Sequence, residues 1–294
     1  MQNGDSIEIT TFDVAKGDCH AIITPSGRLV VIDLGECDYC QPLEAIRQSG
    51  RARIDLLLIT HQHADHIAGI PSLDGMPVGI LHRPNRVPAE LTAQLGDDLK
   101  TAWQNFDARF TAPVVSSDKF YDPGSPSFDG MSIQFFGGRS DSSNLNNYSI
   151  VAVVEFDGFK LLFPGDLEAP GWEKLLADSL FVAAITGTRI LYAAHHGREA
   201  GWYAPLFEVI SPDLTIISDG DEQDTSYTDG YCGVTNGHQV RTRPTTPVEV
   251  LLPNSKECKA ISTRNNGKIV TRVERPALPV ILSEPICTVT VDHH

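Results

Sequence analysis

Residues 60 to 66 of the 294-residue chain read Thr-His-Gln-His-Ala-Asp-His. This stretch directly follows an apolar run, Ile54 to Ile59, and directly precedes a second apolar run, Ile67 to Ile70. Apolar flanks of this kind predict a buried strand before the histidines and a helix after them. The histidine run is therefore expected at the end of a strand, on the edge of a sheet.

The spacing of the run separates its side chains into two pairs. Alternate residues of an extended segment point to one side, so we expect His61 and His63 to bind one metal ion together. Asp65 and His66 lie on the first turn of the following helix and would face a second ion nearby, as in two-metal sites. Imidazole and carboxylate together suit zinc, with manganese or iron as alternatives. A chance meeting of these residues in a polar loop is improbable, since the whole chain has 10 histidines.

Composition limits the classes of partner. The chain has 23 Lys and Arg against 38 Asp and Glu, a formal net charge of -15. This charge argues against broad binding of extended duplex nucleic acid, which depends on cationic side chains that neutralise phosphates. The polar start, Met1 to Asp5, does not resemble a signal peptide, and no apolar run reaches the roughly 20 residues that cross a bilayer. We therefore expect a soluble, cytoplasmic protein without membrane partners, whose oligomeric state the sequence leaves open.

The six cysteines are scattered along the chain and do not form a disulfide framework. Cys37 and Cys40 form a C-x-x-C pair, which suits a redox or zinc site, but no second close pair supplies four ligands. Reduced, partly buried thiols are the simpler interpretation.

Three further strand ends carry polar side chains of the right kind. Asp33 ends the apolar run 29–32, where it could support a ligand histidine or simply form a turn. Asp166 follows the apolar run 159–163, and its alternative role is a helix cap. His195 and His196 follow another apolar run; adjacent strand residues point to opposite faces, so we expect at most one of them to bind metal directly.

Other segments give expectations of secondary structure. Apolar periodicity predicts helices over 88–110 and 199–210, and alternation predicts a closing hairpin of strands 260–263 and 268–273. Residues 281–291 are expected to add an edge strand or a tail. Residues 219–246 are long, polar and irregular, so we expect a substrate-side loop that includes Tyr227 and His238.

The histidine run and its preceding strand resemble the signature of the metallo-β-lactamase superfamily. Two further patterns, Phe12-Asp13-Val14-Ala15-Lys16-Gly17-Asp18 and Ile32-Asp33-Leu34-Gly35, are similar to the opening motifs of its ComEC-type branch, found in DNA-uptake competence proteins and stand-alone hydrolases. Lys16 stands where that branch usually has glutamine. The resemblance implies an α/β fold, an αββα sandwich with metals at one edge. It covers roughly residues 7–273, so we expect one hydrolase domain over 1–275 and a C-terminal extension or edge strand over 276–294.

The resemblance also implies roles for individual residues. Asp166 would bridge the two ions, and the His-His-Gly block is similar to a motif of the ComEC-type branch. We favour His195 as the ligand of the second ion, beside Asp65 and His66, and His196 as an acid or hydrogen-bond donor that faces the substrate. Three residues are thus expected to be catalytic: Asp65, Asp166 and His196.

One position departs from many superfamily members, which have a further histidine between the metal run and the bridging aspartate. This chain has Asn146 and Asn147 there, as the ComEC-type branch does. The resemblance implies a weak amide or water ligand for the His61 and His63 ion, which would then be loosely held.

The expected chemistry follows from two divalent ions, most simply zinc, which make hydroxide available near neutral pH. Phosphoryl oxygens fit two cations well, and the resemblance also indicates phosphodiester hydrolysis by a metal-bridging hydroxide. The acidic surface favours a nucleotide, a short nucleic acid or a small phosphoester as the substrate. Hydrolysis of a lactone, thioester or β-lactam, and a non-enzymatic binding role, remain the alternatives.

Overall fold

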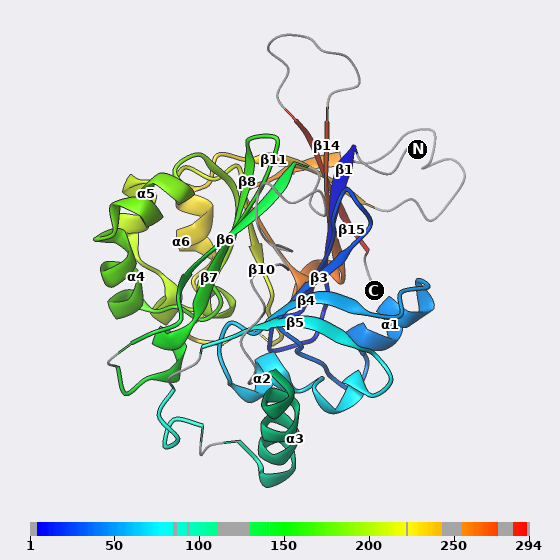
Figure 1. Ribbon diagram of the computed structural model, residues 1–294. Helices are drawn as coiled ribbons and strands as arrows, with labels where there is room; N and C mark the ends of the chain where they lie inside the picture. The colour runs from blue at the N-terminus through cyan, green and yellow to red at the C-terminus, as the bar shows by residue number, and fades with distance from the viewer. Residues whose placement is uncertain are drawn as a thin grey trace.

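Two facing β-sheets form the centre of the computed structural model, with helices on both outer faces (Figure 1). The structure describes residues 5–84, 87–92, 95–110, 130–140, 142–221, 223–242, 255–275 and 285–292. The predicted α/β sandwich is therefore confirmed. Among the described residues, no helix is both long enough and apolar enough to cross a membrane.

The larger sheet has nine strands and contains the strand that feeds the histidine run. Its spatial order is β12 (Ser255–Cys258), β11 (His238–Thr242), β15 (Ile286–Val291), β14 (Ile269–Glu274), β1 (Ser6–Thr11), β2 (His20–Ile23), β3 (Leu29–Ile32), β4 (Ile54–Leu58) and β5 (Val78–His82). Strands β3, β4 and β5 are parallel, whereas β2 runs antiparallel to β3. The start of β2 therefore lies at the same edge as the ends of β3 and β4.

The smaller sheet has six strands. Its order is β13 (Ala260–Ser262), β10 (Leu214–Ile217), β9 (Thr188–Tyr192), β8 (Phe159–Phe163), β7 (Ile150–Phe156) and β6 (Met131–Gly137). Strands β8, β9 and β10 are parallel to one another, so the chain leaves all three at one edge. The turn at Asp157 and Gly158 joins β7 and β8 antiparallel.

Helices cover the outer faces in two groups. The larger sheet carries α1 (Pro42–Gln48), α2 (Ala64–Ile67) and α3 (Asp97–Asp107), and the smaller sheet carries α4 (Ala169–Leu176), α5 (Ser179–Ile185) and α6 (Thr228–Val234) (Figure 1). The helix α8 (Thr263–Asn266) links the two sheets between β13 and β14. Short 3₁₀ turns complete the described elements: η1 (Pro71–Leu73), η2 (Ala108–Phe110), η3 (Leu145–Tyr148), η4 (Ala194–Gly197), η5 (Glu199–Gly201) and η6 (Ala204–Glu208).

Several expected elements are different in the structure. The helix predicted over 88–110 begins only at Asp97, and the helix predicted over 199–210 is two 3₁₀ turns, η5 and η6, the second beginning beside Pro205. The predicted closing hairpin is also wrong, because β13 and β14 belong to different sheets. The segment 219–246 contains α6 and β11 rather than a continuous loop, and residues 222 and 243–254 lie outside the described residues.

The strand β15 lies inside the larger sheet and not at its edge. It pairs antiparallel with β14 and parallel with β11. Its alternating buried residues, Val289 and Val291, belong to the core between the sheets. The position of a boundary at residue 275 stays a prediction, but residues 286–291 are part of the sheet.

The core between the two sheets should dominate the free energy of unfolding. Leu161 on β8 is fully buried in this core, whereas Leu180 on α5 is 72% exposed. We predict that Leu161→Ala lowers the free energy of unfolding by about 2 to 5 kcal/mol, because it leaves a cavity between two packed sheets. The matched control Leu180→Ala should change it by less than about 0.5 kcal/mol. Urea unfolding of both variants measures the difference, and equal losses would contradict this account of the core.

Candidate metal centre

Histidine and aspartate side chains from separate strand ends meet at one edge of the sandwich. His61 follows β4, Asp166 follows β8, and His196 follows β9, all at the ends of parallel strands. Asp18 precedes β2 and reaches the same edge because His20, at the start of β2, pairs with Ile32 at the end of β3. The topology of the two sheets thus brings four segments that are far apart in the sequence to one edge.

The first donor set consists of His61, His63 and Asp166. His61 Nε2 lies 3.0 Å from His63 Nδ1 and 3.7 Å from Asp166 Oδ2. The His61 side chain is fully buried, and its Nδ1 lies 3.2 Å from the Thr60 hydroxyl. The two alternating histidines therefore point into one site, as expected from an extended segment.

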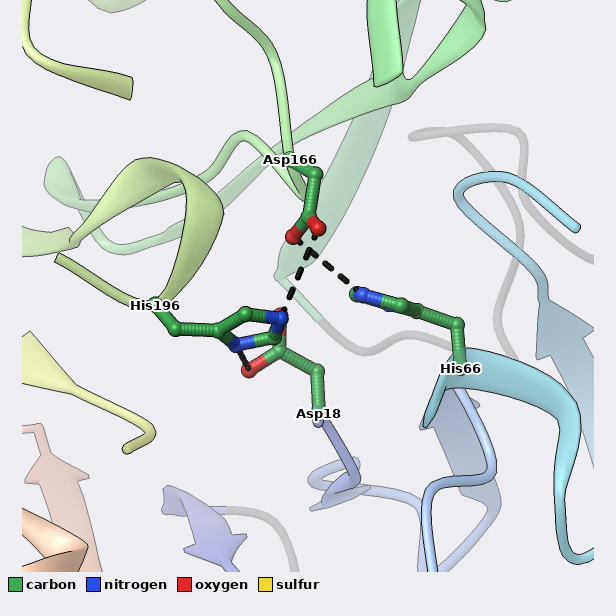
Figure 2. Close-up of side chains that lie close together, drawn as sticks. All are labelled: Asp18, His66, Asp166 and His196. Atoms are coloured by element: carbon green, nitrogen blue, oxygen red, sulfur yellow. Dashed lines mark ion pairs between the residues drawn. The ribbon is translucent and has the colours of Figure 1, made fainter. Parts of the chain in front are cut away.

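The second donor set consists of Asp18, His66, Asp166 and His196, which face one another in Figure 2. His66 Nε2 lies 3.2 Å from Asp166 Oδ1, and His196 Nε2 lies 3.4 Å from Asp166 Oδ2. Asp18 Oδ1 is 4.0 Å from His196 Nδ1 and 3.5 Å from His20 Nε2. Asp166 belongs to both sets, and this is the geometry expected of a bridging carboxylate.

Asp33 supports the second donor set through hydrogen bonds with Thr60 and His66. Its carboxylate accepts hydrogen bonds from the Thr60 amide at 2.7 Å, from the Thr60 hydroxyl at 2.7 Å and from His66 Nδ1 at 2.8 Å. The bond to Nδ1 leaves His66 Nε2 directed at Asp166. Asp33 also has a left-handed backbone, with φ 58°, so it combines the turn and the supporting role that the sequence allowed.

Two glycines permit the close approach of these segments. Gly165 has φ 57°, and a Cβ there would lie 2.8 Å from the Thr60 side chain. Gly17 has φ 132°, and a Cβ there would lie 2.3 Å from the backbone oxygen of Asp65. Any larger residue would push the loop before Asp166, or the loop before Asp18, away from the histidine run.

The described donor set contains His196, whereas the sequence favoured His195 as the ligand. His196 is buried, and its Nδ1 donates to the Ser218 carbonyl oxygen at 3.1 Å, so its Nε2 is free to bind a cation near Asp166. His195 is partly exposed; its Nε2 lies 3.8 Å from Asp166 Oδ2 and its Nδ1 lies 3.2 Å from Glu168 Oε1. Both residues have left-handed φ angles, 50° and 55°, so strand alternation does not apply to them, and the assignment of the ligand stays a prediction.

Asp65 lies beside the second donor set but outside it. Its Oδ2 is 3.7 Å from His196 Nε2 and 3.9 Å from Lys16 Nζ. The described set contains Asp18, which was not expected as a ligand, and the role of Asp65 as a ligand stays a prediction. The sequence contains a signal for Asp18 as a site residue, because Asp18 ends the opening motif that contains Asp13 and lies just before a buried strand.

The two asparagines mainly support the architecture. The side-chain oxygen of Asn147 accepts from the Gly171 amide at 3.0 Å, which fixes the start of α4. Asn146 donates to Glu168 Oε1 at 2.7 Å, and its side-chain oxygen is buried without a hydrogen-bond partner among the described residues. Asn146 thus keeps an oxygen that could serve as a weak ligand, whereas the oxygen of Asn147 is already used. Glu168, which the sequence analysis missed, connects this loop to His195.

The two residues expected on a substrate loop lie on different elements, Tyr227 at the start of α6 and His238 on β11. Tyr227 lies near the His-His-Gly turn, since its amide donates to the Gly197 carbonyl oxygen at 2.8 Å. His238 lies on β11, which is separated from β3 by β15, β14, β1 and β2. His238 thus lies on a strand and not on a loop, and its contact with a substrate stays a prediction.

The charges of the cluster favour a cation between the donors. Burial opposes ionisation of Asp166, but His196 and His66 outweigh it and hold the Asp166 pKa well below its usual value. Burial likewise opposes charge on His196, yet the Asp166 carboxylate raises the His196 pKa to about 9. His61 is different, because burial and the neighbouring His66 hold its pKa well below the usual value. A neutral His61 can act as a metal ligand, and the negative charge of Asp166 favours a cation beside it.

Buried polar atoms without hydrogen-bond partners converge on the same point. They include His66 Nε2, His196 Nε2 and Asp166 Oδ1, in the part of the chain that the structure describes. Leaving such atoms unpaired is costly, and nitrogen and carboxylate oxygen are good donors to zinc and similar divalent ions. The residues present therefore fit a divalent metal, with Asp166 shared between two positions.

A small cavity of about 260 Å³ opens over the donors. His63, Asp65, Asp166 and His195 line it, together with Lys16. Of the two adjacent histidines, His195 and not His196 is thus the one that a substrate entering this cavity would meet.

Comparison with known proteins agrees with the motifs. A family model described as the beta-lactamase superfamily domain matches residues 31–190. The chain is 21% identical over 239 residues to competence protein ComA of Neisseria gonorrhoeae, covering 80% of this chain and 29% of ComA. It is 43% identical over 53 residues to ribonuclease Z of Clostridium tetani, covering 18% of this chain and 16% of that protein. The chain thus spans less than a third of the length of either relative.

Similar solved structures include a diphosphatase from the PhnP family, with 15% identity, a TM-score of 0.42, and coverage of 73% of this chain and 87% of that chain. A long form of ribonuclease Z from yeast has 11% identity and a TM-score of 0.35, covering 97% of this chain and 49% of that chain. The matched family model spans more than half of the chain and includes the histidine run and Asp166. This protein therefore belongs to the metallo-β-lactamase superfamily.

Proposed function

We propose that the protein is a hydrolase of phosphodiesters that uses two divalent metal ions. The observation that carries the proposal is the pair of donor sets that share Asp166 at one sheet edge. His61, His63 and Asp166 would hold one ion, and Asp18, His66, Asp166 and His196 would hold the other. When bound, two such ions would neutralise phosphoryl oxygens and lower the pKa of a coordinated water towards neutrality. Zinc suits these donors best, with manganese or iron as alternatives.

The protein's own residues then position the substrate and move the proton. His195 lies at the cavity wall, 3.8 Å from Asp166 Oδ2, and Glu168 lies 3.2 Å from its other ring nitrogen. Glu168 faces Nδ1, so the other ring nitrogen, Nε2, is the one that would donate a proton to a leaving oxygen. His196 cannot take this role, because it is buried and its Nδ1 is used by Ser218.

A small or short phosphoester fits this chain better than long duplex nucleic acid. The formal charge is -15, and affinity for duplexes depends strongly on cationic contacts to phosphates. Ribonuclease Z, similar over 53 residues, is named for action on RNA, which is a phosphodiester polymer. That name supports the bond type in the proposal and leaves the substrate itself open.

The first prediction concerns the shared carboxylate. Asp166→Asn should remove essentially all hydrolysis of bis-p-nitrophenyl phosphate, because it weakens both metal positions at once. The matched control is Asp178→Asn, which changes the same group at the cap of α5, away from the donor sets. Rates should be measured with zinc and with manganese, and the bound metal should be counted by elemental analysis. Retained activity in Asp166→Asn would overturn the hydrolase proposal.

The second prediction separates the adjacent histidines. His196→Ala should lower the bound metal by about one ion per chain, since it removes a buried donor. His195→Ala should keep its metal and lose about 10²- to 10⁴-fold in kcat, the usual contribution of a positioned proton donor. Metal content and kcat measured on both variants decide the matter. Metal loss in His195→Ala with metal retained in His196→Ala would restore the assignment first expected from the sequence.

The third prediction concerns unequal affinity of the two positions. The first set offers three donors and the second offers four, so the His61 and His63 position should lose its ion first. Stepwise dialysis of the loaded protein against a chelator should show two release phases, and His63→Ala should abolish only the earlier one. A single cooperative release would contradict this prediction.

A further inference from the structure

A second cavity in the described part of the protein lies beside the metal centre. It has a volume of about 970 Å³, against about 260 Å³ for the cavity over the donors, and Lys16 lines both. A volume near 970 Å³ is at the upper end of the range for sites that enclose a whole small-molecule ligand. A phosphodiester bound at the metals would therefore extend one of its two substituents past Lys16 into this larger cavity.

Among the described residues, four cationic and three acidic side chains line the larger cavity. The cations are Lys16, Arg198, Arg264 and Lys268, and the acids are Asp13, Asp219 and Asp221. Cationic side chains gathered at a cavity of a chain with a formal charge of -15 favour an anionic ligand only where one of them lacks a carboxylate partner.

Three of the four cations already have carboxylate neighbours. Arg264 pairs with Asp219 at 2.8 Å, and Lys268 pairs with Asp292 at 3.1 Å. Lys16 lies 3.9 Å from Asp65. Arg198 is different: it has no carboxylate within ion-pair distance among the described residues, and its Nε is buried without a hydrogen-bond partner there. A guanidinium with an unsatisfied buried N–H favours a bidentate anion such as a phosphate.

The backbone fixes Arg198 in this position. Its amide donates to the His195 carbonyl oxygen at 3.0 Å, and it forms a β-bridge with Ser226. The residue follows directly after the turn that carries His196, so a shift of Arg198 would disturb the metal donors. Arg198 is thus a preorganised cation two residues from a metal donor, and little order has to be gained when a ligand binds.

An aromatic side chain completes the cavity. Tyr39 lines it and is 65% exposed. Exposed aromatic rings beside cationic side chains are the usual means of stacking a nucleic-acid base next to its phosphate. A quaternary ammonium group such as choline would meet unfavourable charges from Arg198 and Lys16.

We propose that this cavity binds the nucleoside and a second phosphate of a nucleotide phosphodiester, and that Arg198 recognises the second phosphate. The inference rests on the proposed function for the position of the scissile bond. It makes the substrate a nucleotide diester with at least two phosphates, as in a dinucleotide or a short single strand, rather than a phosphocholine ester.

The test uses two substrates that differ only in the second phosphate. They are the p-nitrophenyl ester of thymidine 5′-monophosphate and the same compound with a 3′-phosphate. The 3′-phosphate should raise kcat/KM of the wild type by about 10- to 100-fold, the range of a charge-assisted contact. Arg198→Gln should reduce this ratio to near one, and Arg198→Lys should restore part of it. The control Arg53→Gln removes the same charge from a side chain outside the cavity, so it should keep the wild-type ratio.

Binding without turnover separates this inference from the proposed function. Thymidine 3′,5′-bisphosphate should bind the wild type about 10-fold more tightly than thymidine 5′-monophosphate in calorimetry, and Arg198→Gln should remove the difference. If no diester is hydrolysed but this difference is seen, the hydrolase proposal fails and the phosphate site stands. Equal kcat/KM with and without the 3′-phosphate, or faster cleavage of p-nitrophenylphosphorylcholine than of either nucleotide ester, would overturn the inference.

Discussion

The buried carboxylate of Asp33 is the constraint on which the site depends. It is fully excluded from solvent and accepts from the Thr60 amide, the Thr60 hydroxyl and His66 Nδ1, so it ties the end of β3 to the end of β4 and to α2. A buried charge is tolerable only when it is fully hydrogen-bonded, so the loop containing the histidines has little freedom to adopt another path. The positions of the metal donors follow from a polar interaction that does not itself touch the substrate.

Topology supplies the other half of the site. Parallel strands deliver Asp166 and the His-His-Gly turn to the edge reached by β4, and the antiparallel β2 begins at that same edge, which brings Asp18 among them. The turn that carries His195 and His196 is strained, with three successive left-handed residues including Gly197 at φ 72°. Strain of this kind persists where the surroundings fix it, here through Ser218 on one side and Ser226 on the other. The turn directs His196 into the donor cluster and Arg198, which follows Gly197, towards the larger cavity.

Much of this could be predicted from local sequence, and the failures have physical causes. The histidine run, the apolar strands and Asp166 carry strong periodic signals, so the family, the sandwich and the shared edge followed from them. The roles of His195 and His196 did not, because left-handed φ angles remove the alternation on which the prediction depended. Asp18 and Arg198 were missed for another reason: their proximity to the donors depends on strand order and on a cavity, which no local pattern encodes. Likewise, β11 was hidden in a polar segment because only one of its five residues, Val240, is buried.

The strand order of the larger sheet also constrains how the chain can fold. β1, at residues 6–11, pairs with β14, at residues 269–274. β11 is joined to β14 only through β15, at residues 286–291, which lies between these two strands. Pairings between such distant segments form slowly, because a long loop must be closed before any contact stabilises it. The donors, by contrast, all lie between residues 18 and 196. During synthesis the ligands thus emerge well before the sheet can be completed, and until then β1 and β11 expose open edges that other chains could pair with.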